Sequence, residues 1–281
     1  MSALVPHHSA TLLVATVVSS CLAFGAQAQD SSPWQRDSHS AVRLLAGSRS
    51  GPVMLGGIAL ALQPGWKTYW RTPGDSGVPP RFDFSKSENV EAVTVLWPAP
   101  TKFDDGAGGH SLGYHDQVVL PLRIVAKNPD KPMTLRADIS YAVCEKICIP
   151  VEAKAELAFT SVASTEDTTL SAALDTVPKP ATVGDANPLT IRDVKRDGQK
   201  DVVVDVAVAV ADPRSVQLYV EGPTPDWALP IPTVRDSGMP GIKRFAFELD
   251  GVPPGVKPDG AALKFTLVGP DKSYEFNFTL R

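Results

Sequence analysis

Two cysteines separated by three residues are the side chains of this sequence best suited to chemistry. Cys144 and Cys148 lie in the stretch YAVCEKICIPVE, residues 141–152, and the third cysteine, Cys21, lies near the N-terminus. A proximal pair can form a structural disulfide, bind a metal as two thiolates, or cycle between dithiol and disulfide. These three chemistries differ in what they require of the surrounding chain.

A purely structural disulfide at this position would add little stability. Closing a loop of about five residues removes only ~2 kcal/mol of unfolded-state entropy, against ~4.7 kcal/mol for a loop of about 100 residues. Two residues four positions apart on one extended strand have Cα atoms ~13 Å apart, from ~3.3 Å per residue. A disulfide needs roughly 4.4–6.8 Å. The segment must therefore fold back in a turn.

A metal site has few further ligands available. Zinc sites usually take four ligands at recognisable spacing, but beyond residue 28 the sequence offers only His39, His110 and His115 besides the pair. Two thiolates also suit copper(I). The spacing alone favours the structural disulfide and the redox pair equally, and it favours a metal site less.

The N-terminus has the features of a secretory signal peptide. Residues 1–29 contain no Asp, Glu, Lys or Arg, and the apolar run TLLVATVVSSCLAF, residues 11–24, precedes the small-residue site Ala26-Gln27-Ala28. This pattern predicts export with removal of residues 1–28. Lipidation at Cys21 and a retained anchor are the alternatives. Outside the cytosol the cysteine pair can persist as a disulfide, and we expect no membrane span in the mature chain because no later apolar run is long enough.

The composition indicates a β-rich protein that does not bind nucleic acid. The net charge is −4 and the sequence pI is about 5.7, so there is no basic footprint for a nucleic acid. With 26 prolines and 21 glycines, many short strands joined by turns are expected. The runs expected to form strands are Val53–Leu62, Ala92–Leu96, Gln117–Val125, Met133–Tyr141, Ala155–Thr160, Asp201–Val210, Val216–Val220, Arg244–Leu249, Leu263–Val268 and Tyr274–Leu280.

These runs fall into two groups, residues 30–163 and 187–281, each of a length typical of a β-sandwich. Between them, residues 164–186 contain one helical pattern, Thr169–Val177, which ends before a proline. The sequence therefore predicts an all-β fold of two β-sandwich domains joined by a short helical linker. The second domain contains no Cys and no His, so we expect it to be a spacer or a docking surface.

Three blocks around the cysteines resemble the amino-terminal domain of the DsbD family of thiol:disulfide interchange proteins. They are PGWKTYWRTPGDSGVPP at 64–80, WPAPTKFDDGAGGHSLGYHDQVVLPL at 97–122 and ISYAVCEKICIPVEAKAEL at 139–157. The resemblance covers most of residues 45–160 and is closest to the branch associated with suppression of copper sensitivity. Residues 187–281 also resemble the additional immunoglobulin-like domain of that branch.

The resemblance implies an immunoglobulin-like sandwich that relays electrons in the periplasm as a thiol–disulfide oxidoreductase. It implies that Cys144 and Cys148 are the redox pair, that Phe103 caps them with Asp104 and Asp105 as acidic neighbours, and that Tyr69 lies beside them. Some family members space their cysteines differently, so loop geometry and reduction potential do not transfer.

The implied partners are a membrane-embedded or thioredoxin-like electron donor and an oxidised periplasmic thiol protein as acceptor. No cofactor and no metal are expected for this chemistry. Because the sequence contains neither the membrane hub nor the thioredoxin-like domain of full-length members, we expect it to act as a stand-alone protein with a separate donor. The alternative function is a non-enzymatic copper-handling or docking module, with the cysteines as metal ligands or as a structural disulfide.

Overall fold

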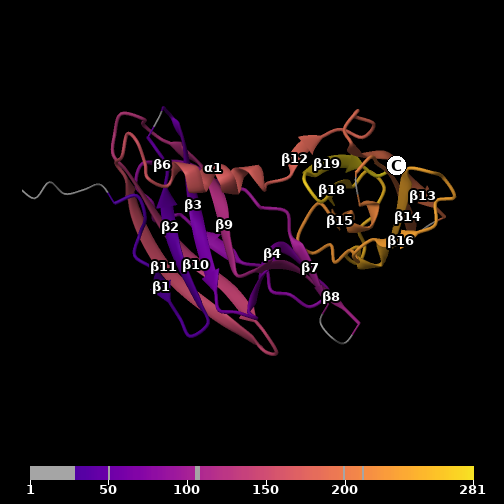
Figure 1. Ribbon diagram of the computed structural model, residues 1–281, viewed down its shortest axis with the longest axis horizontal. Coiled ribbons are helices and arrows are strands. Elements are labelled where there is room, and N and C mark those ends of the chain that lie inside the picture. The colour runs from indigo at the N-terminus through magenta and orange to yellow at the C-terminus, as the bar shows by residue number, and fades with distance from the viewer. Residues whose placement is uncertain (1–28, 50, 105–107, 199, 211) are drawn as a thin grey trace, which may run out of the picture.

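A computed structural model describes residues 29–281, except residues 50, 105–107, 199 and 211. The predicted signal peptide, with Cys21, lies outside the described residues, as does Asp105. None of the helices in the described ranges is long and apolar enough to cross a membrane. The chain forms two β-sandwiches side by side, the first in indigo to magenta and the second in orange to yellow (Figure 1).

The first sandwich packs a five-stranded sheet against a six-stranded one. Alternation places one side of each strand in the core: in β10, for example, Leu135, Ala137 and Ile139 are buried while the residues between them are half-buried. The five-stranded sheet has the order β1 (Gln35–Arg36), β2 (Ser40–Ala46), β3 (Val53–Leu62), β9 (Gln117–Ala126), β6 (Val90–Val95). The six-stranded sheet has the order β11 (Cys148–Phe159), β10 (Met133–Cys144), β4 (Lys67–Gly74), β8 (His110–His115), β7 (Thr101–Asp104), with β5 (Arg81–Asp83) paired to β10.

The second sandwich packs two four-stranded sheets around a separate core. The valine-rich run at 201–208 forms a central strand in which Val202, Val204 and Val206 are fully buried. One sheet has the order β12 (Lys179–Ala181), β19 (Ser273–Thr279), β18 (Ala262–Val268), β15 (Gln217–Glu221), and the other has β13 (Leu189–Asp197), β14 (Asp201–Val208), β17 (Ile242–Glu248), β16 (Thr233–Arg235). Two 3-10 turns, η1 (Pro213–Ser215) and η2 (Leu249–Gly251), connect strands.

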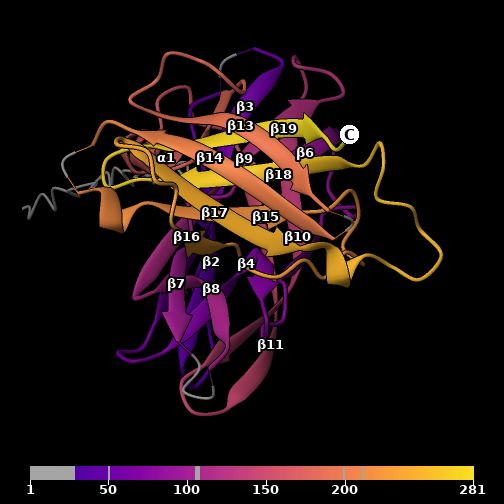
Figure 2. The ribbon, with the colours of Figure 1, turned by 90° about the vertical axis from the view of Figure 1, so that its right-hand side faces the viewer.

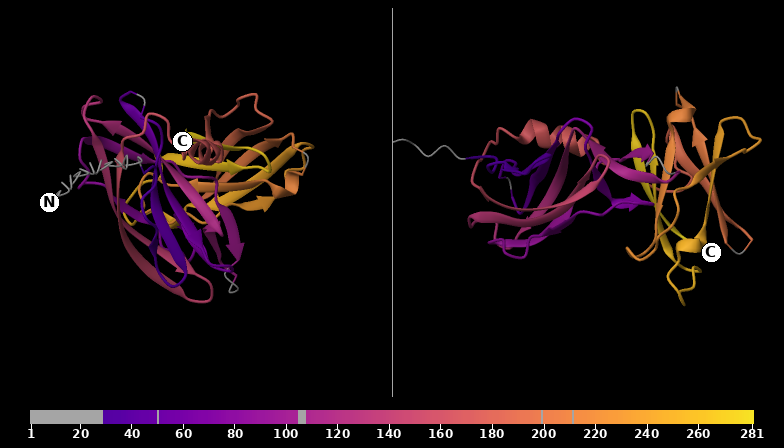
Figure 3. Two further views of the ribbon diagram at one scale, coloured as in Figure 1. Left: turned by 60° about the vertical axis from the view of Figure 1, so that its left-hand side comes forward. Right: turned by 90° about the horizontal axis from the view of Figure 1, so that it is seen from below.

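The two sandwiches differ in the direction of their strands (Figure 2). Seen from below, they lie next to each other, and the yellow strands of the second sandwich lie on the side facing the first (Figure 3).

The predicted all-β class is confirmed, since strands make up both units and only one α-helix, α1 (Asp167–Asp175), occurs in the described residues.

The helix α1 packs on the first sandwich, which the linker prediction did not anticipate. Its Leu170 is fully buried against Leu45 and Ala59, on the side of the five-stranded sheet that faces away from the main core. Asp167, in the first turn, accepts hydrogen bonds from the Ser48 backbone N–H at 2.8 Å and from its hydroxyl. The helix of the predicted linker, residues 164–186, therefore belongs structurally to the first sandwich.

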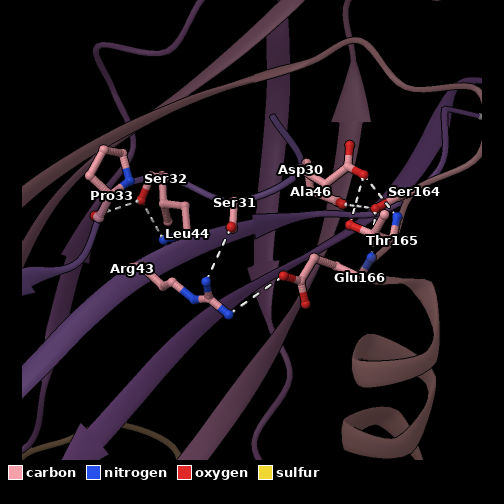
Figure 4. Close-up of polar contacts among 10 residues, drawn as sticks. All are labelled: Asp30, Ser31, Ser32, Pro33, Arg43, Leu44, Ala46, Ser164, Thr165 and Glu166. Carbon is pink, nitrogen blue, oxygen red and sulfur yellow. Dashed lines mark hydrogen bonds and ion pairs between the residues drawn. The ribbon is translucent and has the colours of Figure 1, made fainter. Parts of the chain in front are cut away.

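Polar contacts hold the start of this helix to the N-terminal segment and to β2 (Figure 4). The Arg43 guanidinium donates to the Ser31 hydroxyl at 3.2 Å and to the Glu166 carboxylate at 3.5 Å. The Asp30 carboxylate accepts from the Thr165 backbone N–H at 2.8 Å, and the Ser164 hydroxyl donates to the Ala46 carbonyl at 2.6 Å. These bonds attach the residues just before the helix to the first sandwich, at a helix end whose N-cap residue Glu166 makes no side-chain capping bond.

We expect Leu170→Ala to lower the free energy of unfolding by about 2–4 kcal/mol, because it removes a fully buried side chain. The matched control is Leu174→Ala on the same helix, where the side chain is 41% exposed and the expected change stays within ~0.5 kcal/mol. Urea unfolding of both variants measures the difference. Equal effects at the two positions would show that the helix does not pack on the sheet.

Candidate functional site

The two cysteines close the end of a long antiparallel hairpin. Strands β10 and β11 pair without interruption from Met133 opposite Phe159 to Cys144 opposite Cys148. The register brings the two Cα atoms to 4.2 Å, and the sulfurs form a disulfide. The turn that the spacing required is therefore present, as the tip of a hairpin whose strands extend to the cysteines.

The disulfide presents its two sulfurs differently. Cys144 is buried, with 2% of its surface exposed, and lies in a small cluster with Tyr69 and Ala142. Cys148 is exposed, and the preceding Ile147 is 69% exposed. A molecule approaching from solvent therefore meets the Cys148 side of the bond.

Tyr69 contacts both sulfurs through its hydroxyl; its role as a site residue stays a prediction. Its hydroxyl donates to Cys144 Sγ at 2.8 Å and lies 3.1 Å from Cys148 Sγ. Burial raises the pKa of Tyr69, so the hydroxyl stays protonated and remains a donor at neutral pH. A donor aimed at sulfur stabilises a thiolate more than a neutral sulfur, because hydrogen bonds to a charged group are stronger.

Tyr69 is positioned by the strand β4, which lies beside β10. Thr68 and Lys67 pair with Val143 and Cys144, and the Thr68 hydroxyl donates to the Ala142 carbonyl at 2.9 Å. This pairing fixes the height of Tyr69 along the hairpin, so its ring reaches the disulfide from the neighbouring strand.

Two glycines allow the chain to close around Tyr69, and sequence reasoning missed both. A Cβ on Gly113 in β8 would lie 1.9 Å from the Thr68 carbonyl oxygen, so only glycine permits this approach of β8 to β4. A Cβ on Gly77 would lie 2.7 Å from the Tyr69 ring and 2.3 Å from Pro73. For Gly113, the signal in the sequence was a glycine inside the strand-like run SLGYH.

Phe103, the predicted cap, lies on the edge strand β7 and is half-buried. The Lys67 ammonium lies 5.2 Å from the centroid of its ring, and His115 meets the ring edge-on at 6.1 Å. Lys67 also donates to the Ser111 hydroxyl at 3.0 Å. Phe103 thus contacts Lys67 on β4, the register partner of Cys144; its capping role stays a prediction.

The structure describes one of the two acidic neighbours that were predicted for the cap. Asp104 is 83% exposed in its side chain, and its carboxylate lies 2.8 Å from His110 Nδ1. Asp105 lies outside the described residues. In the described part of the chain, no three His, Cys, Asp or Glu side chains are grouped as a metal site would require.

Comparison with known proteins finds one family match, over the segment around the disulfide. Residues 48–160 match the family model described as thiol:disulfide interchange protein DsbD, N-terminal. No curated protein matches the chain at a significant level.

The crystal structure of the N-terminal periplasmic domain of ScsB from Proteus mirabilis is similar in fold, with a TM-score of 0.71 at 23% identity, covering 89% of this chain and 98% of that one. The match spans both sandwiches and agrees with the predicted immunoglobulin-like fold. A conserved domain protein from Bacillus anthracis aligns over 84% of this chain and 75% of its own at 10% identity, but its TM-score of 0.25 carries no argument.

We expect Tyr69→Phe to make the reduction potential of the Cys144–Cys148 pair more negative by roughly 10–40 mV, because loss of the donor destabilises the thiolate form. Equilibration of the variant with glutathione buffers measures the shift. The control is Tyr141→Phe, which removes a hydroxyl from the same hairpin whose partners are Ser40 and Asp37. Equal shifts in the two variants, or none at Tyr69, would contradict a specific role for the Tyr69 hydroxyl.

Proposed function

We propose that this protein relays electrons by thiol–disulfide interchange through Cys144 and Cys148, since residues 48–160 match the family model of the DsbD N-terminal domain. The observation that carries the proposal is a disulfide at the tip of a hairpin, half buried and half exposed, with the Tyr69 hydroxyl against both sulfurs. A bond that closes so short a loop contributes little stability, so its placement is better explained by reactivity.

The reduction half-reaction starts at the exposed sulfur. A thiolate of the donor attacks Cys148 Sγ, the disulfide breaks, and its electron pair leaves on Cys144 Sγ. The Tyr69 hydroxyl, 2.8 Å from that sulfur, stabilises the departing thiolate. A second donor thiolate then attacks the mixed disulfide and releases Cys148, so the donor leaves oxidised and this pair holds two electrons as a dithiol.

The delivery half-reaction runs in the opposite sense. The Cys148 thiolate attacks a disulfide of the acceptor, which releases one acceptor thiolate and forms a mixed disulfide with Cys148. Cys144 then attacks Cys148 Sγ, re-forms the internal disulfide and releases the second acceptor thiolate. Because the hairpin register holds the two cysteines opposite each other, this resolving step is intramolecular and competes well with dissociation.

The proposal places the relay in the periplasm after removal of residues 1–28. Its donor is a membrane-embedded or thioredoxin-like protein and its acceptor an oxidised envelope protein. Support comes from the sequence of the N-terminus and from the matched ScsB domain, which is periplasmic. In the same proposal Phe103, held by Lys67, covers the pair between encounters. Copper tolerance is the physiological setting suggested by the branch that the sequence resembles.

Single-cysteine variants test the proposed roles of the two sulfurs. Cys144→Ser leaves the exposed Cys148, which we expect to accumulate mixed disulfides with periplasmic proteins when the variant is produced with its own N-terminus. Cys148→Ser leaves the buried Cys144, and we expect at least about tenfold less trapped material, because a buried thiol is less accessible for exchange. Non-reducing electrophoresis followed by mass spectrometry identifies the trapped proteins.

Two results would contradict the proposal. Equal trapping by both variants would remove the asymmetry on which the mechanism depends. Trapping by neither variant, together with tight copper(I) binding by the reduced protein that is lost in Cys144→Ser, would favour a metal-handling module.

A further inference from the structure

The second sandwich packs against the first with part of one sheet face. In the sheet β12-β19-β18-β15, Tyr219 of β15 pairs with Thr266 of β18, which in turn pairs with Glu275 of β19. Glu221 lies two residues after Tyr219 on β15. These four side chains therefore share the face directed away from the core of their own sandwich. Thr266 is nevertheless fully buried and Tyr219 is 2% exposed. Figures 1 and 3 show this sheet on the side facing the first sandwich.

Tyr219 enters the core of the first sandwich. It belongs to the same buried cluster as the residues of β2, β9 and β10, and half-buried Ile231 and Val268 pack against that cluster as well. Its ring centroid lies 6.0 Å from that of Trp70, which is fully buried. Trp70 follows Tyr69 directly on β4, so the apolar contact between the sandwiches falls one residue from the site.

The next residue on β4, Arg71, carries the polar part of the same contact. Its guanidinium donates to Glu221 through Nε at 2.9 Å and Nη2 at 2.7 Å, and Nη2 also donates to Glu275 at 2.6 Å. The Thr72 hydroxyl donates to Glu221 at 2.7 Å. Burial acts to lower the pKa of Arg71, but hydrogen bonds and charge from Glu221 and Glu275 outweigh it and raise the pKa, so the guanidinium stays charged in the contact.

The register of β4 is irregular where these contacts occur. Tyr69 pairs with Gly113 in β8, but the next pair is Gly74 with Ser111, so residues 70–73 form an irregular stretch opposite Leu112. The regular ladder thus stops at Tyr69, and the chain beyond it is held by side-chain contacts to Tyr219, Glu221 and Glu275.

We infer that Arg71 is a positioning residue through which the second sandwich holds Tyr69 against the cysteine sulfurs. The second sandwich is then part of the redox site, because it sets how well the Tyr69 hydroxyl stabilises a thiolate at Cys144 or Cys148. This inference deepens the proposed interchange function and rests on it. It also gives a role to the domain that contains no cysteine or histidine.

A double-mutant cycle tests the inference. The reduced protein and the variants Arg71→Met, Tyr69→Phe and Arg71→Met/Tyr69→Phe are compared by the pH dependence of iodoacetamide alkylation. We expect Arg71→Met to slow alkylation at neutral pH roughly threefold to tenfold, since a weaker hydrogen bond leaves less thiolate. In the Tyr69→Phe background the same substitution should cause no further loss, because Arg71 acts through the Tyr69 hydroxyl.

Arg136→Met is the matched control. Arg136 lies on β10 and also pairs with two carboxylates, Glu156 at 2.7 Å and Glu88 at 2.8 Å, but both partners belong to the first sandwich. It should leave the alkylation profile unchanged. If Arg71→Met does not fold, Glu221→Gln weakens the same contact and is expected to slow alkylation in the same direction.

Additive losses in the cycle, or an unchanged profile in both Arg71→Met and Glu221→Gln, would overturn the inference. The measurement needs no redox partner, because reduced protein can be prepared by refolding in the presence of reductant. A failure of the proposed interchange function would instead appear as a disulfide that is not reduced in the folded protein. The two failures are therefore distinguishable.

Discussion

The antiparallel register between β10 and β11 is the constraint on which the rest of the site depends. Each strand is 12 residues long, and their pairing continues to the two cysteines. A shift of one residue would move Cys144 to the opposite face of the sheet, away from Tyr69. As register partners the two cysteines share one face of the sheet; Cys144 is buried on β10, which β4 flanks, and Cys148 is exposed on the edge strand β11.

Because Cys144 is buried and Cys148 is exposed, an attacking thiolate is expected to reach Cys148 Sγ first. Attack at Cys148 leaves the negative charge on Cys144, where the Tyr69 hydroxyl is the donor at hand. Within a β-sandwich that already has a continuous core and a long hairpin ladder, a disulfide that closes so short a loop adds little stability. Its location at the end of the ladder suits exchange with another protein better than reinforcement of the fold.

Local patterns in the sequence were sufficient for much of this arrangement. The C-x3-C spacing required a turn, alternating apolar residues predicted most strands, and a family resemblance indicated Tyr69 as a neighbour of the pair. The predicted strands Met133–Tyr141 and Ala155–Thr160 were too short toward the turn, since Cys144 and Cys148 themselves pair in the ladder. In β11, exposed residues such as Pro150 and Glu152 alternate with half-buried ones. Because proline is uncommon inside strands, Pro150 argued against a strand that begins at Cys148.

Other features depend on contacts between residues far apart in the chain, which no local pattern reveals. Arg71 meets Glu221 and Glu275 across the two sandwiches, yet each looks like an ordinary surface charge in the sequence. The helix near residue 170 is expected from the stretch 169–177 and the proline that follows it, but its packing on the first sandwich follows from Leu170 and from the Ser48 and Arg43 contacts. Gly77 and Gly113 matter only because Tyr69 and Thr68 lie against them.

The central claim is that the Cys144–Cys148 disulfide exchanges electrons while the protein stays folded. The most direct measurement is titration of the folded mature protein against glutathione redox buffers, with thiols counted by alkylation and the fold followed by circular dichroism. We predict one reversible two-electron transition with the β-sheet signal unchanged throughout. A disulfide that resists reduction until the sheet signal is lost would contradict the account and identify the bond as structural.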